Sequence, residues 1–174
     1  FLVDLILDQA SSKGTGMWSS SAALALGSVN NMMSSAVFAR YISALKETRC
    51  SLAEQKSKPI KKEKISVSEL KDAYTFARII NHIQGFNLIE AASEKYGWDY
   101  NPSKISRIWT QGCIIRSQLM ERLSEEFKSD KTILKINLLF NLLKETEAGA
   151  ASIIHHGIDQ KIPLDGYGTA YNYW

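Results

Sequence analysis

Hydrophobic residues recur at helical spacing along most of the chain. The longest pattern predicts a helix from Ser66 to Gly97, with one apolar stripe through Leu70 and Tyr74 and a second through Phe76 and Ile83. A helix that is apolar on two sides is expected to pack on two sides. No alternation of apolar and polar residues is long enough to indicate a strand. The pattern therefore predicts an all-α fold, with residues 1–174 forming a single helical domain.

Shorter helices are predicted on both sides of this central one. Upstream, we expect a first helix that contains Val3, Ile6 and Leu7 and ends near residues 11–16, a short helix capped by Ser19 or Ser20 that ends at Gly27, and a longer helix from about Asn30 or Asn31 to about Gln55. Downstream, helices are expected over residues 102–108, 114–127, 132–144 and 148–160, with a last turn after Pro163. The lysine-rich stretch 56–64, which contains Pro59, is interpreted as an exposed connector.

Composition excludes several classes of function. The net charge of +3 is too small to indicate a polyanion-binding surface, and the lysines of the connector have no interleaved aromatic residues, so no nucleic-acid partner is expected. No apolar run reaches the roughly 18 residues that a membrane span needs. Cys50 and Cys113 have neither zinc-site nor disulfide spacing, which is typical of a reducing cytoplasm. Because the chain starts at Phe1, we interpret it as a piece of a longer protein.

The first candidate site is the sequence Lys13-Gly14-Thr15-Gly16, which precedes a predicted helix. Its glycines allow the backbone to approach a ligand closely, and a helix N-terminus offers unpaired N–H groups to an anion. Lys13 adds a positive charge and Thr15 adds a hydroxyl donor. On local pattern alone, a simple loop between helices is the more frequent explanation. A dinucleotide fingerprint is excluded because no strand precedes the loop and no third glycine follows at the required spacing.

The second candidate is Arg40, which shares a predicted helical stripe with Met33, Val37 and Ala44. A charge on an otherwise apolar stripe needs a partner, and an internal carboxylate is the usual one. Without a nearby carboxylate, a phosphate held by two parallel guanidinium donors is the sharper explanation. The three histidines, His82, His155 and His156, are interpreted as ordinary core or surface residues. No metal site, nucleophile or acid and base pair is indicated.

Longer stretches around these candidates resemble a known family. The segments LILDQASSKGTGMWSSSAALALGS, AVFARYISALKETR and IWTQGCIIRS resemble, in this order, three blocks of the helical domain of 6-phosphogluconate dehydrogenase. The resemblance implies an enzyme that oxidises 6-phosphogluconate with NADP and decarboxylates the product to ribulose 5-phosphate. It also implies that Lys13, Thr15 and Arg40 hold the substrate phosphate, with Ile114 as a weaker candidate for contact with the sugar.

The resemblance further implies what these 174 residues do not contain. In the family, the nucleotide-binding domain and the catalytic lysine and glutamate precede this region, and a tail that reaches the neighbouring subunit follows it. We therefore expect no catalytic or cofactor-binding residue here, an inactive isolated segment, and a cytoplasmic homodimer in which this region forms the dimer surface. Met17 departs from the family, which commonly has a second lysine there. The alternative is a non-catalytic helical interaction domain derived from that family.

Overall fold

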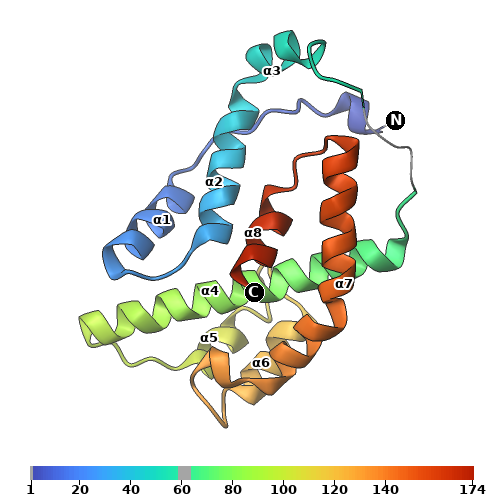
Figure 1. Ribbon diagram of the computed structural model, residues 1–174. Coiled ribbons are helices and arrows are strands. Elements are labelled where there is room, and N and C mark those ends of the chain that lie inside the picture. Colours follow the sequence, from blue (N-terminus) through green and yellow to red (C-terminus); the bar gives the residue numbers. More distant parts are fainter. Residues whose placement is uncertain (1, 59–63) are drawn as a thin grey trace.

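The computed structural model describes residues 2–58 and 64–174, and all its regular elements are helical. Figure 1 shows α4 crossing the molecule, with α1, α2 and α3 on one side of it and α5 and α6 on the other. None of the described residues forms a strand, so the predicted all-α fold is confirmed. The elements are the 3-10 helices Leu2–Leu5 and Ile133–Lys135 and the α-helices α1 (Thr15–Leu26), α2 (Asn31–Ala44), α3 (Lys46–Ala53), α4 (Val67–Tyr96), α5 (Pro102–Ile108), α6 (Gln118–Glu126), α7 (Asn137–Gln160) and α8 (Asp165–Tyr173).

Helix α4 is the scaffold of the fold. Ser66 and Glu69 form a reciprocal capping box at its start, and Gly97 ends it in the left-handed conformation with φ 68°. Its middle third is buried on more than one side, as the two apolar stripes predict, and α7 packs along it. Gly149 allows this close approach, because a Cβ there would lie 2.5 Å from Cβ of Asp72 on α4. The core therefore lies between α4 and α7 and extends to α6 and α8.

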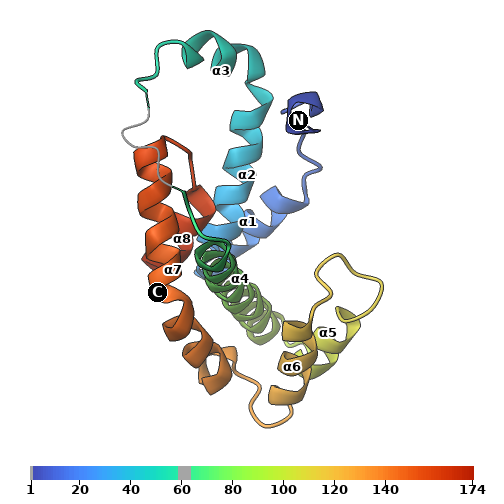
Figure 2. The same ribbon diagram turned by 90° about the vertical axis from the view of Figure 1, so that its right-hand side faces the viewer.

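Helices α1 to α3 project away from this core, as Figures 1 and 2 show. No residue of α2 or α3 is buried. The start of α2 is fixed by Gln84, a fully buried residue of α4: its side-chain oxygen accepts from the amide of Met32 at 3.0 Å, and its side-chain nitrogen donates to Asn31 at 2.5 Å. Because a buried amide needs partners, this pair of hydrogen bonds fixes where α2 leaves α4.

The structure corrects several predicted boundaries. Residues 6–13 form no helix, and the first predicted helix, expected to end near residues 11–16, is reduced to a 3-10 turn at Leu2–Leu5, because the chain there bonds to α2 and α3 instead of to itself. Helix α1 begins at Thr15, before the predicted caps Ser19 and Ser20. The helices expected over 132–144 and 148–160 are one helix, α7, and α6 starts later than predicted, after the Ser117 cap. The predicted start of the long helix at Ser66 and the opening of α5 at Asn101 and Pro102 are confirmed.

The long helix predicted from Asn31 to Gln55 is also interrupted. Leu45, with φ −84° and ψ 44°, separates α2 from α3. The carbonyls of Ser43 and Ala44 accept hydrogen bonds from Arg49 and Gln9, so they are engaged by side chains at the point where the helix breaks. Residues 59–63 of the predicted connector lie outside the described residues. Within the described part, no helix has both the length and the apolar character needed to cross a membrane.

Glu69 is expected to make stability depend on pH. Hydrogen bonds from Ser152 on α7 and from Ser66 lower its pKa from 4.5 to about 2. Because the folded-state pKa lies below the unfolded value, the stabilisation is fully present above about pH 4.5 and is lost as the pH falls towards about 2. Urea unfolding of the wild type and of Glu69→Gln should therefore differ most near neutral pH and converge in acid. Glu126→Gln, at an exposed position, is the control, and a pH-independent difference for Glu69→Gln contradicts the prediction.

Candidate functional site

The sequence Lys13-Gly14-Thr15-Gly16 lies directly at the N-terminus of α1. Gly14 is the N-cap residue, and its φ of 89° is a conformation that favours glycine. No side chain caps this helix and no acidic residue lies in its first turn. The first amides of an α-helix have no partner within the helix, so those of Thr15 and Gly16 remain available to an anion. The glycine loop therefore leads directly into the helix, whereas the predicted helix began only at Ser19 or Ser20.

Arg40 on α2 faces the start of this loop. Its Nη2 donates to the backbone carbonyl of Ser11 at 2.5 Å. Three residues earlier on the same helix, Val37 contacts Gly16 so closely that a Cβ on the glycine would lie 2.6 Å from Cγ2 of Val37. Residues three apart lie on one side of a helix, so α2 holds the loop at both of its ends. Lys13 and Thr15 lie between these two points of attachment, and both are exposed.

The surroundings of Arg40 decide whether its guanidinium is available to bind an anion. The side chain is exposed rather than enclosed in an apolar stripe, so the expectation of a charge that must be neutralised internally is not met. Among the described residues, no carboxylate lies within ion-pair distance of Arg40, and its recorded partner is a neutral carbonyl. Because a guanidinium has several N–H donors, most of them remain available for an anion.

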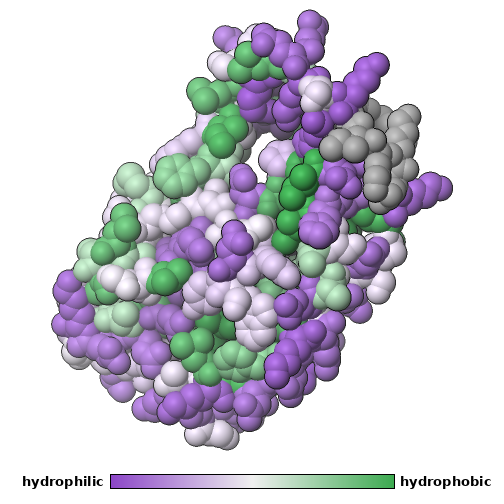
Figure 3. All heavy atoms as spheres, viewed as in Figure 1, coloured by the Kyte–Doolittle hydropathy of each residue, from purple (hydrophilic) through white to green (hydrophobic). Residues whose placement is uncertain are grey.

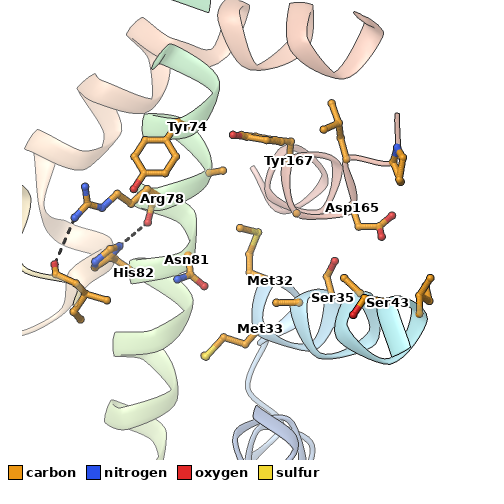
Figure 4. A pocket seen from close by; sticks show the side chains of 18 of the residues that line it. Met32, Met33, Ser35, Ser43, Tyr74, Arg78, Asn81, His82, Asp165 and Tyr167 are labelled. Carbon is orange, nitrogen blue, oxygen red and sulfur yellow. Dashed lines mark hydrogen bonds between the residues drawn. The ribbon is translucent and has the colours of Figure 1, made fainter. Parts of the chain in front are cut away.

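Ile114 lies apart from the other predicted residues. It is fully exposed on the loop between α5 and α6 and lines a cleft of about 880 Å³ that is also lined by residues of α2, α4 and α8. Figure 4 shows this cleft, with Met33 and Ser43 on α2, Tyr74 and His82 on α4, and Tyr167 on α8. Lys13, Thr15 and Arg40 are not among its lining residues. The structure therefore places Lys13 and Thr15 in the segment that α2 holds, places Arg40 on α2 itself, and places Ile114 at the cleft, which Ser43 and Arg49 also line.

Helix α4 contributes Tyr74, Arg78, Asn81 and His82 to the lining of the cleft. Burial lowers the pKa of His82, although its Nδ1 lies 2.6 Å from the carbonyl oxygen of Arg78. Arg78 contacts the ring of Tyr74, with 5.8 Å from Cζ to the ring centroid, and donates to the carbonyl of Ile115 at 3.5 Å. His82 is thus a core-edge residue bonded to its own helix. Within residues 2–58 and 64–174, no group of three or more potential metal ligands is assembled.

Sequence reasoning missed a second set of polar residues beside the loop. Asp8 and Arg49 are 41 positions apart and form an ion pair, with Nη1 and Oδ2 separated by 2.9 Å. They fall in two separately predicted helices, and a pairing over that distance leaves no local pattern. The segment that contains Asp8 is extended but forms no strand, so the glycine loop lacks the strand required before a dinucleotide fingerprint.

Together these features give a helical structure with an uncapped helix start and a lysine on one exposed loop, and an exposed arginine on α2, which contacts this loop; such groups are suited to binding an anion. The family model for the C-terminal domain of 6-phosphogluconate dehydrogenase matches residues 1–174. The chain belongs to this family, as the resemblance of its sequence blocks implied.

Individual relatives agree with this assignment. The chain is 33% identical to a decarboxylating 6-phosphogluconate dehydrogenase of Pseudescherichia vulneris and 34% identical to that of Citrobacter freundii, covering 100% of this chain and 41% of each relative. A solved structure of Plasmodium falciparum 6-phosphogluconate dehydrogenase, described in its apo form and in complexes with its cofactor NADP+ and its substrate 6-phosphogluconate, matches with a TM-score of 0.90 at 28% identity. That match covers 99% of this chain and 39% of the solved one, so the chain spans about two fifths of such enzymes.

Proposed function

We propose that this chain binds the phosphoryl group of 6-phosphogluconate through Lys13, Thr15 and Arg40. The observation that carries the proposal is the attachment of the loop to α2 at both ends, through Ser11 and Gly16, with Arg40 facing it and no acid paired with that arginine among the described residues. Lysine and arginine supply two positive charges for a phosphate dianion, and the threonine hydroxyl and the first amides of α1 supply neutral donors.

Ile114 has a lesser part in the proposal. Its side chain is fully exposed and apolar, and it projects from the loop between α5 and α6 at a cleft that residues of α2 also line. We assign to it a contact with the uncharged part of the substrate. Such a contact contributes less to affinity than charge-assisted hydrogen bonds to phosphate.

The proposal places this chain within an NADP-dependent enzyme of the pentose phosphate pathway that converts 6-phosphogluconate to ribulose 5-phosphate by oxidation and decarboxylation. The names of the curated relatives support this activity, and the chain spans 41% of the first of them. The catalytic groups and the main NADP contacts are assigned to the rest of such an enzyme, and the isolated chain is expected to be inactive. We assign the enzyme to the cytoplasm.

We further propose that the chain forms a homodimer. Helix α2 has no buried residue, and large apolar side chains are exposed along it and at the residue that follows it: Phe38, Tyr41, Ile42 and Leu45 are 43–63% exposed. Figure 3 shows apolar residues over the face formed by α1 and α2. Exposed apolar surface of this kind is typical of a face that another chain covers. The same observation favours the alternative function, a non-catalytic helical interaction domain, which predicts association without phosphate binding.

Ligand titration of the purified chain separates the two functions. We expect 6-phosphogluconate and inorganic phosphate to shift the NMR signals of the Gly14, Thr15 and Gly16 amides, and gluconate to leave them unchanged, because the loop binds the phosphoryl group. Lys13→Ala should lower the affinity for 6-phosphogluconate and for inorganic phosphate by roughly tenfold, because one charge-assisted contact is lost. Lys104→Ala removes a lysine at the start of α5 and is the matched control. Equal shifts with gluconate, or no shift with any ligand, would refute phosphate binding.

A further inference from the structure

The segment before the phosphate loop is fastened to the junction of α2 and α3 in antiparallel order. Lys46 donates to the carbonyl of Leu7, Gln9 donates to the carbonyl of Ala44 at 3.4 Å, and the amide of Ala10 donates to Oγ of Ser43 at 3.0 Å. The series ends where Arg40 donates to Ser11. Figure 2 shows this N-terminal segment leading into α1 beside α2. The position of Lys13 therefore depends on how these residues hold the segment.

Arg49 makes the densest set of contacts in the series. Its Nη1 donates to the carboxylate of Asp8 at 2.9 Å, and its Nη2 donates to the carbonyl of Asp8 at 2.6 Å and to the carbonyl of Ser43 at 3.1 Å. One guanidinium thus joins the segment to the end of α2. A planar fork of donors suits this arrangement, whereas a lysine ammonium is a compact charge on a flexible stem.

Asp8 has an unusual backbone conformation, with φ 55°. Residues other than glycine adopt this region at a cost, although aspartate tolerates it better than most. The two contacts from Arg49 hold both the side chain and the carbonyl of Asp8 in this geometry. The left-handed residue turns the chain ahead of the stretch that pairs with Ser43 and Arg40. The direction in which the loop reaches α1 is therefore fixed at Asp8.

An isolated ion pair on the surface would not be enough to hold the segment in place, because exposed pairs contribute weakly to stability. The Arg49 side chain is 32% exposed, and two of its three contacts are to backbone carbonyls on two separate segments. These contacts orient the chain rather than neutralise a charge. They also lie away from the main core, since no residue of α3 is buried. Loosening them is expected to move the loop without unfolding the domain.

We propose that Arg49 and Asp8 are positioning residues for phosphate binding: their contacts set the path of residues 8–12 and so bring Lys13 and Thr15 beside Arg40. The proposal rests on the proposed function of the loop. It assigns no contact between Arg49 and the ligand. Loss of the contacts lowers affinity because the loop must then be ordered at the expense of binding free energy.

The test compares Arg49→Ala and Arg49→Lys with the wild type in the purified chain. Three readouts are needed: the urea midpoint of global unfolding, amide hydrogen exchange of residues 9–14, and the dissociation constant for 6-phosphogluconate. We expect an unchanged midpoint, faster exchange, and affinity about tenfold lower in both variants, because lysine does not reproduce the fork. Asp8→Asn, which keeps the carbonyl acceptor, should give a smaller loss. Arg122→Ala on the distant α6 is the matched charge control.

Outcomes for the proposed function and for this inference are distinct. If the wild type binds no phosphate ligand at the loop, the proposed function fails. If the wild type binds and Arg40→Ala abolishes binding, but Arg49→Ala keeps wild-type affinity, the positioning role is overturned even where exchange is faster. Unchanged exchange of residues 9–14 in Arg49→Ala overturns it whatever the ligand does. A lowered urea midpoint in Arg49→Ala and Arg49→Lys, in proportion to the loss of affinity, also overturns it, because general destabilisation then explains the result.

Discussion

In the full-length enzyme, Arg40→Ala is expected to raise the KM for 6-phosphogluconate by roughly 100-fold, equivalent to about 3 kcal/mol, while the KM for NADP stays nearly unchanged. In the proposed function the guanidinium supplies charge-assisted donors to the phosphoryl group, and its hydrogen bond to the Ser11 carbonyl also holds the segment before the loop. Both contributions are lost in alanine. Steady-state kinetics with each substrate varied in turn measures the effect.

Two further variants sharpen this measurement. Arg40→Lys keeps the charge but not the fork, so its KM for 6-phosphogluconate should lie between those of the wild type and Arg40→Ala. Arg107→Ala removes an exposed arginine from α5, which lies on the other side of α4, and should leave both constants unchanged. An equal rise in the two KM values for Arg40→Ala would contradict the assignment, because it would indicate a general defect rather than loss of the phosphate contact.

The parts of the fold that local chemistry determines were predicted well. The limits of α4 were predicted at Ser66 and Gly97 from the extent of the apolar pattern, and the structure shows local caps at both: a capping box of Ser66 with Glu69, and Gly97 in the left-handed conformation. Asn101 followed by Pro102 defines α5 in the same way. The all-α class follows from these periodic segments, because no competing strand pattern exists.

The errors occur where distant residues decide the structure. Ile6 and Leu7 lie at helical spacing from Val3, yet they form no helix, because the next carbonyls accept hydrogen bonds from the side chains of Lys46 and Arg49. The same contacts engage the last carbonyls of α2, where a continuous helix was predicted. Conversely, a separate helix was predicted to begin at residue 148, whereas Gly149 lies inside the continuous helix α7 and allows it to contact Asp72 of α4. Neither effect leaves a signal within one turn of the affected residue.

In the candidate site, too, some residues could be predicted from local patterns and others could not. Lys13 and Thr15 are recognisable because glycines flank them, and Arg40 because a charge stands among apolar neighbours, so all three come from local patterns and from the family resemblance. The structure adds that α2 holds the loop at both ends. Asp8 and Arg49 could not be singled out, because an ion pair across 41 positions is visible only once the chain is folded.

Replacing Phe86 with alanine is expected to lower the free energy of unfolding by about 3–5 kcal/mol, a large part of the roughly 5–15 kcal/mol typical of a domain. Its ring is 1% exposed and lies 4.8 Å from that of Phe127 and 5.5 Å from that of Trp109, so it joins α4 to the ends of α6 and α5. The loss combines the transfer of the ring to water with the cavity left among neighbours that relax only partly.

Phe38→Ala is the matched control for this measurement, because it makes the same change on a helix where the ring is 63% exposed. Urea unfolding at a protein concentration low enough to keep the chain monomeric should show a loss of no more than about 1 kcal/mol for this variant. A loss for Phe86→Ala as small as that for Phe38→Ala would contradict the packing of α4 against α5 and α6. Because Phe86 packs against Trp109 and Phe127, next to α5 and α6 on the side of α4 away from α1 and α2, the surviving folded fraction of Phe86→Ala should bind 6-phosphogluconate with wild-type affinity. This result would separate the stability of the scaffold from ligand binding at the loop.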